Sequence, residues 1–491
     1  MELDAVGMSE AIRSGKLDRV KLVKQSYQKI DKLNCKLNAV IYRRDKRALQ
    51  EAAQFVDKGQ PFAGIPLLLK GLGQSLAGER DTNGARLLQN NYAATTDNFV
   101  RRLEQAGFII IGQTNIPEFG FKNITDPVLY GPARNPWNLQ YSPGGSSGGS
   151  ASAAAAGIVP LAAGNDGGGS IRIPASFAGL IGLKPTRGRV PVGPGSWRGW
   201  QGASINFGLT KSIRDTATLL DTLQVLQPAA PFQTPIIKPG FMARLEQPLK
   251  KNLKVAYSTE SPVGSEVSEE AKLAVSEAVD FLNAQGIQTE KVTNPLNGPE
   301  LMRSYYIVNS GETASMFEKI EKQLGRQVTV DDMELTTWVI YQAGLLLSAK
   351  DYSQTLSLWD EASAVMDQLY DSYDLYLTPT TAYTAPKIDA KLITDESIDK
   401  MRHVTELGKE ERLDLIYEFF DASLKLTPFT QQANMTGQPA ISLPTFISKK
   451  GLPLGIQFIG RKGDESTLLQ VGQLFEQKHK FKMLRKTDIL Q

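Results

Sequence analysis

Ser142-Pro-Gly-Gly-Ser-Ser-Gly-Gly-Ser-Ala-Ser-Ala-Ala-Ala-Ala-Gly157 and Ala163-Gly-Asn-Asp-Gly-Gly-Gly-Ser-Ile-Arg-Ile-Pro174 are the two most unusual stretches of this sequence. A flexible linker is disfavoured, because the glycines stop abruptly at an alanine-rich helix and at an apolar run. A phosphate-binding loop is also disfavoured, because neither segment continues into Gly-Lys-Ser/Thr and the glycines from Gly71 to Gly78 have the wrong spacing for GxGxxG. The third interpretation is a serine nucleophile in a glycine-rich turn.

The second segment has the residues that an acyl-transfer site needs. Three successive glycines before Ser170 let the backbone turn its N–H groups toward one point, since glycine has no Cβ. The oxyanion of an acyl substrate attacked by Ser170 would then lie among the amides of Gly167, Gly168, Gly169 and Ser170. Trp197 and Trp200 follow in a Gly/Pro-rich loop, where their pattern fits packing somewhat better than a pocket wall.

The base for such a serine is not expected to be a histidine. The chain has two histidines, His403 in Met-Arg-His-Val and His479 in Lys-His-Lys, and both settings are typical of a solvated surface. A buried lysine can replace imidazole, because desolvation lowers its pKa from ~10.4 toward neutrality. Lys70, at the end of the apolar run Leu67–Leu69, is the lysine best placed for burial, and a solvated charge at a strand end is the alternative.

Length and composition exclude several classes of protein. A chain of 491 residues suggests about three domains at ~150 residues each, although single α/β enzymes also reach this length. The net charge of +3 gives no electrostatic basis for binding nucleic acid or an acidic membrane surface. The single cysteine, Cys35, excludes an intramolecular disulfide and a cysteine-rich zinc site. Met1–Asp4 does not resemble a signal peptide, and Leu335–Leu347 is too short and too polar to span a bilayer, so we expect a cytoplasmic protein.

Apolar periodicity predicts an α/β protein. Ile65–Leu69 and Phe108–Gly112 are predicted strands, and the helical stretch Thr96–Ala106 between them completes a βαβ-like alternation. Similar alternation continues along the chain. The fold class predicted is therefore α/β, with a mixed, largely parallel central sheet covered by helices on both faces.

The predicted domain organisation has two parts. Residues 1–60 form an N-terminal helical segment, which packs on a single large domain of residues 61–491. Residues 227–250 contain five prolines and are predicted to be a surface connection within that domain.

Several motifs, in order along the chain, resemble the amidase signature family. They are Gly-Gly-Ser146-Ser147-Gly-Gly-Ser, Asp166-Gly-Gly-Gly-Ser170-Ile-Arg172-Ile-Pro-Ala and Gly-Leu-Lys184-Pro-Thr. Other segments with the same likeness are Gly112-Gln-Thr-Asn115-Ile-Pro-Glu118-Phe, Asp374-Leu-Tyr-Leu-Thr-Pro379-Thr, Asn434-Met-Thr-Gly437-Gln-Pro439 and Gly451-Leu-Pro-Leu-Gly455-Ile-Gln457. The likeness covers nearly the whole chain, so it also implies the amidase signature fold.

The resemblance implies a Ser–cis-Ser–Lys triad. Ser170 falls on the acylated nucleophile, Ser146 on the relay serine that follows a cis peptide bond, and Lys70 on the base; the interval of 24 residues between the two serines is the family's usual one. It implies no metal and no organic cofactor. Among supporting residues, Asp166 is expected to hold the glycine turn and Arg172 to pair with a buried carboxylate such as Asp166, while Ser147 either hydrogen-bonds within the site or caps a helix.

The chain departs from the family pattern at two places, which bear on the identity of the substrate and on the pKa of the lysine base. The family commonly has Lys-Asp at the base, where this chain has Lys70-Gly71, and its Thr-Asp-x-Gly-Gly-Ser is here Asn165-Asp166-Gly-Gly-Gly-Ser. The Asp-Gly-Gly-Gly-Ser-Ile-Arg form resembles hydrolases of 6-aminohexanoate cyclic dimers. The identity of the substrate stays open.

The resemblance implies hydrolysis of a small-molecule linear or cyclic amide, with no nucleic acid or membrane partner, and it is compatible with a homodimer. Two alternatives to a stand-alone amidase remain, one within the family and one from a different functional class. One is the glutaminase subunit of a tRNA-dependent amidotransferase, although Thr427–Asn434 looks more like stand-alone amidases. The other is a catalytically silent amide-binding homologue, against which the intact Lys70, Ser146 and Ser170 argue. A nucleotide-binding enzyme is the remote third option.

Overall fold

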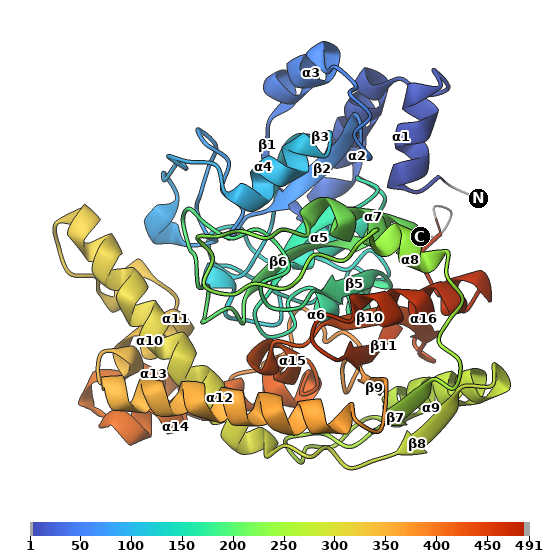
Figure 1. The fold of residues 1–491 in the computed structure, drawn as a ribbon. Coiled ribbons are helices and arrows are strands. Elements are labelled where there is room, and N and C mark those ends of the chain that lie inside the picture. The colour runs from blue at the N-terminus through green and yellow to red at the C-terminus, as the bar shows by residue number, and fades with distance from the viewer. Residues whose placement is uncertain (1–2, 486–491) are drawn as a thin grey trace.

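Two β-sheets form the framework of the structure, a computed structural model that describes residues 3–485 (Figure 1). The larger sheet has eight strands in the spatial order β4-β6-β5-β10-β11-β9-β7-β8. These strands are β4 (Ala162–Asp166), β5 (Ile181–Lys184), β6 (Ile205–Thr210), β7 (Lys254–Tyr257), β8 (Gln288–Lys291), β9 (Leu375–Pro379), β10 (Ala440–Ile447) and β11 (Pro453–Gly460). The smaller sheet has the order β1-β3-β2 and consists of β1 (Val40–Arg43), β2 (Ile65–Lys70) and β3 (Phe108–Thr114).

The mixed α/β fold with a sheet flanked by helices is confirmed, but the sheet is not largely parallel. From β4 across to β9, each pair of neighbouring strands is antiparallel, whereas β9–β7 and β7–β8 are parallel. The predicted βαβ alternation is present as the parallel pair β2–β3 with α4 (Asn98–Gln105) between them, and it belongs to the smaller sheet. A buried apolar run indicates a strand covered on both faces but does not give the direction of its neighbour, and here the β10–β11 hairpin places antiparallel pairs at the centre.

Helices cover both faces of the larger sheet. α5 (Gly148–Ala155) and α6 (Arg172–Ala178) contact each other, and α6 packs on β5, β10 and β11. α7 (Ile213–Leu223), α9 (Glu269–Ala284) and α16 (Glu465–Gln477) pack on the same sheet as a second group. α5 consists of glycine, serine and alanine, all of them buried, so its backbone lies close to both sheets.

The first sixty residues contain more than the predicted helices. α1 (Ala5–Arg13), α2 (Arg19–Leu37) and α3 (Asp45–Gln54) are present, and strand β1 between α2 and α3 pairs antiparallel with β3. The strand was missed because it is four residues long and has one fully buried side chain. The carboxylate of Asp215 on α7 accepts the N–H groups of Ala5 and Val6, both at 2.9 Å, and so joins α1 to the main core.

A helical layer lies beside the larger sheet, with most of its helices at the lower left of Figure 1 and α15 nearer the centre. It consists of α10 (Gly298–Leu324), α11 (Leu335–Gly344), α12 (Ala349–Leu369), α13 (Asp395–Arg402), α14 (Lys409–Leu426) and α15 (Gln431–Thr436). Its apolar side chains form a core of their own that includes Val308, Ile340, Trp359 and Ile416. The predicted connection at residues 227–250 contains the short helix α8 (Phe241–Leu245), which packs on α7 and α16. Short 3₁₀ helices occur at Arg86–Leu88, Glu118–Gly120, Val330–Asp332 and Val404–Glu406.

A buried ion pair fixes the start of α16 to the segment after β5. Arg189 Nε and Nη2 donate to Glu465 Oε1 and Oε2, both at 3.0 Å, and the Thr186 N–H donates to Oε1 at 2.9 Å. Both side chains are at most 1% exposed. Burial by itself would raise the pKa of Glu465, but Arg189 and the Thr186 N–H lower it below its usual value.

We predict that Glu465→Gln lowers the free energy of unfolding by about 3–5 kcal/mol, because it leaves the Arg189 charge buried without a partner. Urea denaturation at neutral pH measures this loss, with Glu318→Gln in the exposed Glu318–Lys322 pair as a control that loses nothing measurable. Because the folded pKa of Glu465 is lowered, the contribution of the pair is present above ~pH 4.3 and disappears as the pH falls through the folded value. Equal stability of Glu465→Gln and wild type would contradict this role.

Candidate active site

Lys70, the last residue of β2, is buried, with 1% of its surface exposed. Its Nζ donates to Ser146 Oγ at 2.7 Å and to Asn165 Oδ1 at 2.5 Å. Burial lowers the pKa of Lys70 well below its usual value, and the nearby carboxylate of Asp166 opposes that shift only in part. The structure therefore has the buried lysine that the sequence predicts, rather than a solvated strand-end charge, and it favours the neutral amine.

Ser146 and Ser147 lie in the turn before α5. The peptide bond between Gly145 and Ser146 is cis, which the family resemblance implies. Ser147 stands at the N-cap position of α5, but its side chain makes no capping hydrogen bond. Its Oγ donates to the Asn165 carbonyl at 3.2 Å and its N–H to the Ser170 carbonyl at 3.3 Å. Of the two roles considered for Ser147, the structure shows hydrogen bonding within the site.

Asp166 and Arg172 form a fully buried ion pair beneath the glycine turn. All five N–H groups of Arg172 are used: Nε and Nη2 donate to Asp166, Nη1 to the Thr430 carbonyl and Gln457, and Nη2 also to Asn434. Burial would raise the pKa of Asp166, but Arg172 and Asn434 lower it well below its usual value, so the group stays a carboxylate. The pair matches the structural roles expected for these two residues.

One of the four backbone donors expected at the glycine turn is engaged within the turn itself. Asp166 Oδ1 accepts the Gly169 N–H at 2.7 Å. The Gly169 amide therefore points at the Asp166 carboxylate. The N–H groups of Gly167, Gly168 and Ser170 have no hydrogen-bond partner within residues 3–485. The Gly169 N–H is therefore not available to an oxyanion, because its hydrogen bond to Asp166 holds the turn.

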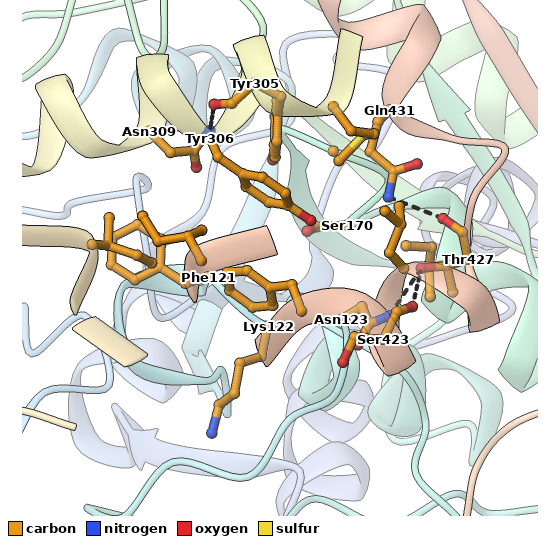
Figure 2. Close-up of a pocket in the computed structure, with 18 residues that line it drawn as sticks. Phe121, Lys122, Asn123, Ser170, Tyr305, Tyr306, Asn309, Ser423, Thr427 and Gln431 are labelled. Atoms are coloured by element: carbon orange, nitrogen blue, oxygen red, sulfur yellow. Dashed lines mark hydrogen bonds between the residues drawn. The ribbon is translucent and has the colours of Figure 1, made fainter. Parts of the chain in front are cut away.

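Ser170 is half-buried between two cavities. The first, which we call the inner chamber, has about 620 Å³ of empty space including open solvent, and its wall includes Gly168, Ser170 and Ile173. Figure 2 shows Ser170 among the residues that line it. The second, the outer cavity, encloses about 1190 Å³ including open solvent and has Ser146, Asn165 and Gly167 in its wall. Ser170, Gly120 and Phe121 line both cavities. A ligand that spans both would therefore place its middle at Ser170.

Aromatic rings cover the glycine turn. The Trp200 indole lies against Gly167, where a Cβ would come within 2.7 Å of the ring, and the Tyr305 hydroxyl lies over Gly168, where a Cβ would come within 2.5 Å of it. Trp200 stacks on Phe121 with ring centroids 6.2 Å apart and meets Tyr305 edge to face at 5.8 Å. Trp200 thus lines the outer cavity, although the sequence favoured a packing role for it. Trp197 is not part of the wall of either cavity.

Sequence reasoning missed several polar residues that support the site. Asn165 bonds the Lys70 amine, Gln74 Oε1 accepts the Lys70 backbone N–H at 2.8 Å, and Asn434 joins Asp166 and Arg172. Asn165 and Asn434 stand inside motifs that the resemblance already marks, so their positions could have indicated them. Gln74 had no such signal.

Gly71, which stands where the family commonly has aspartate, lies tightly packed. A Cβ at this position would come within 2.9 Å of the Thr114 carbonyl oxygen and 3.2 Å of Ile41. A side chain there would require a backbone shift at the end of β2. The nearest polar support for Lys70 comes instead from Gln74 and Asn165.

Two wider searches of residues 3–485 gave negative results. No group of three histidine, cysteine or acidic side chains is arranged to hold a metal ion among these residues. Within the same range, every helix is too short or too polar to cross a membrane.

We predict that Gly168→Ala lowers the free energy of unfolding by about 1–3 kcal/mol, because the new methyl group meets the Tyr305 hydroxyl. The same change in a Tyr305→Phe background should cost clearly less, since the hydroxyl is the closest atom. Urea denaturation of wild type, the two single variants and the double variant gives the coupling free energy between positions 168 and 305. Equal costs in both backgrounds would show that the hydroxyl does not restrict this position.

Comparison with known proteins agrees with this geometry. A family model described as Amidase matches residues 21–469. A lipoamidase from Enterococcus faecalis is 44% identical over 479 residues, which cover 97% of this chain and 63% of that protein, so this chain spans less than two-thirds of its length. A 6-aminohexanoate-cyclic-dimer hydrolase from Paenarthrobacter ureafaciens is 33% identical over 96% of this chain and 94% of its own.

Solved structures with the same fold include a 6-aminohexanoate cyclic dimer hydrolase, which superposes with a TM-score of 0.89 at 30% identity over 100% of this chain and 99% of that chain. A bacterial aryl acylamidase of the amidase signature family superposes with a TM-score of 0.84 at 25% identity over 97% of this chain and 96% of that chain. From the family model, the relatives and the fold together, the chain belongs to the amidase signature family and is an amide hydrolase that acts on carbon–nitrogen bonds other than peptide bonds.

Proposed function

We propose that this protein hydrolyses its amide through an acyl-enzyme on Ser170, with Ser146 as the proton relay and Lys70 as the base. The observation that carries the proposal is the 2.7 Å hydrogen bond between the buried Lys70 amine and Ser146. Ser170, the proposed nucleophile, lines both cavities. The lowered pKa of Lys70 supports it, because only a neutral amine can take a proton.

The mechanism uses the groups of this chain alone. Ser170 Oγ attacks the amide carbon while its proton passes to Ser146 and the Ser146 proton passes to Lys70. The oxyanion accepts hydrogen bonds from the free amides of Gly167, Gly168 and Ser170. The C–N bond then breaks as Ser146 protonates the leaving amine and regains a proton from Lys70. Water attacks the acyl-enzyme by the same route and releases the acid and free Ser170.

The name of the 44% identical relative suggests one candidate substrate, a lipoamide. We further propose that the protein acts in the cytoplasm without a metal or organic cofactor, and that it acts alone or as a homodimer. A glutaminase subunit would instead depend on partner proteins for activity.

We predict that Ser170→Ala abolishes turnover, with a loss of about 10⁴-fold or more, and that Ser146→Ala and Lys70→Ala each cost about 10²–10⁴-fold. The fold should survive, because Ser170 is only half-buried. Intact mass after incubation with a fluorophosphonate should show one adduct on wild type, mapped to Ser170 and absent from Ser170→Ala. Substantial activity in Ser170→Ala would overturn the mechanism.

The pH profile tests the base. If Lys70 must be neutral, kcat/KM rises as the pH passes upward through its lowered pKa. Asn165→Asp places a carboxylate beside the Lys70 amine, favours the ammonium form and should move the acidic limb of the profile to higher pH by about 1–3 units. Gln354→Glu, which adds the same charge at an exposed position, is the matched control. A limb that does not move in Asn165→Asp would argue against Lys70 as the base.

A further inference from the structure

Glu312 places a carboxylate in the wall of the outer cavity, which Ser146 and Ser170 also line. It stands on α10 and is half-buried. Within residues 3–485, no lysine or arginine nitrogen lies within 4.0 Å of its oxygens. A carboxylate partly withdrawn from water loses hydration, so a positive charge brought by a ligand would stabilise it.

The protein's own cations near this cavity are engaged or distant. Lys319 also lines the cavity, but it is exposed and follows Glu312 by seven residues of α10, about 10 Å along the helix axis. Arg198 does not line the cavity, and its Nη1 donates to Gln201 Oε1 at 3.4 Å. In the part of the chain that the structure describes, the Glu312 charge therefore has no ion-pair partner.

Two neutral donors hold the Glu312 carboxylate in place. Oε1 accepts the Tyr352 hydroxyl at 2.5 Å and Gln201 Nε2 at 3.2 Å. Burial and the Glu312 charge raise the pKa of Tyr352, so its hydroxyl remains a donor. Oε2 has no hydrogen-bond partner among residues 3–485 and is not enclosed by the protein. One oxygen thus fixes the orientation of the side chain, and the other stays available to a ligand.

The loop that holds Glu312 also brings an aromatic ring into the same cavity. Trp200 and Gln201 are adjacent, with φ values of 49° and 52°, which residues with a Cβ rarely adopt. Such backbone strain persists where contacts hold it and is concentrated at ligand-binding segments. Trp200 and Phe121 line the outer cavity, and Gln201 bonds Glu312. A carboxylate beside aromatic rings is a combination that favours an organic cation.

We propose that Glu312 binds a positively charged group of the substrate, so that the protein prefers amides that carry an ammonium group. The inference rests on the proposed function, because Glu312 acts on the substrate only if Ser170 is the nucleophile of this cavity. The ammonium group donates to Glu312 Oε2, and the carbon chain that carries it lies along the rings of Phe121 and Trp200. A neutral group gains no such bond, and a carboxylate is repelled.

Protection of Ser170 from the fluorophosphonate tests this preference with probes that need not be cleaved. Hexylammonium, hexan-1-ol and hexanoate differ in their terminal group. Hexylammonium should slow the labelling of wild type at a concentration at least about 10-fold lower than hexan-1-ol requires, and hexanoate should protect least. Equal protection by hexylammonium and hexan-1-ol would overturn the inference, as would stronger protection by hexanoate, which would point to Lys319.

Glu312→Gln separates the charge from the structural contacts, because the amide oxygen can still accept from Tyr352 and Gln201. This variant should need about 10-fold or more hexylammonium for the same protection, while the value for hexan-1-ol stays within about 2-fold of wild type. Glu318→Gln, at an exposed position of the same helix, is the control that changes neither value. Equal changes for both probes would show that Glu312 is only structural. If Glu312→Gln fails to fold, the wild-type comparison decides.

Cleavage extends the test to substrates. N-(5-aminopentyl)butanamide is compared with N-hexylbutanamide, and N-butyl-6-aminohexanamide with N-butylheptanamide, so that in each pair an ammonium group replaces a methyl group. The two pairs carry the charge on opposite sides of the scissile bond. For at least one pair, kcat/KM of wild type should be about 10-fold or more higher for the ammonium compound, and Glu312→Gln should remove the difference. Absence of any such preference in both pairs would overturn the inference.

Binding to Ser170→Ala keeps this inference distinct from the proposed mechanism. If Ser170 of wild type is labelled but the three probes protect equally, the mechanism stands and the role of Glu312 is wrong. If Ser170 is not labelled, the mechanism fails, and the charge preference is measured by calorimetry instead. Ser170→Ala should then bind hexylammonium more tightly than hexan-1-ol, and equal binding would overturn the inference.

Discussion

The buried Asp166–Arg172 pair is the interaction on which the rest of the site depends. Asp166 ends β4 and Arg172 begins α6, and the guanidinium reaches Gln457 on β11 and Asn434 on α15. An unpaired charge in this interior would cost several kcal/mol, so the pair is stable only while all its partners are in place. The glycine turn between the two residues, which includes Ser170, is therefore fixed in position.

Burial has opposite outcomes for the two ionisable groups Asp166 and Lys70. Asp166 keeps its charge because Arg172 and Asn434 outweigh the cost of burial, whereas Lys70 hydrogen-bonds the neutral oxygens of Ser146 and Asn165, and the carboxylate of Asp166 offsets its burial only in part. The pKa values of both groups are lowered, with different results. The acid stays ionised and structural, and the amine tends to the neutral form that can accept a proton.

The helical layer decides what the site can accept. α10 contributes Tyr305 over the glycine turn and Glu312 at the outer cavity, and α14 contributes Ile416 and Phe420 to the inner chamber. The side chains of Trp200 and Tyr305 require glycine beneath them, because a Cβ at Gly167 would collide with the Trp200 ring and a Cβ at Gly168 with the Tyr305 hydroxyl. The glycines proposed to bind the oxyanion thus also permit the aromatic cover of the site.

The sequence by itself determined the family and the α/β class, and it singled out Lys70, Ser146, Asp166, Ser170 and Arg172 as candidate site residues, because glycine turns, buried strand ends and motif order are local properties of the chain. Only the tertiary structure decided the antiparallel pairing around β10 and β11, the engagement of the Gly169 amide by Asp166, and the parts played by Asn165, Gln74 and Trp200. These features depend on contacts between segments far apart in the chain. The division of the site into two cavities is of the same kind, since their walls combine residues from Leu72 to Gln431 whose proximity no local pattern reveals.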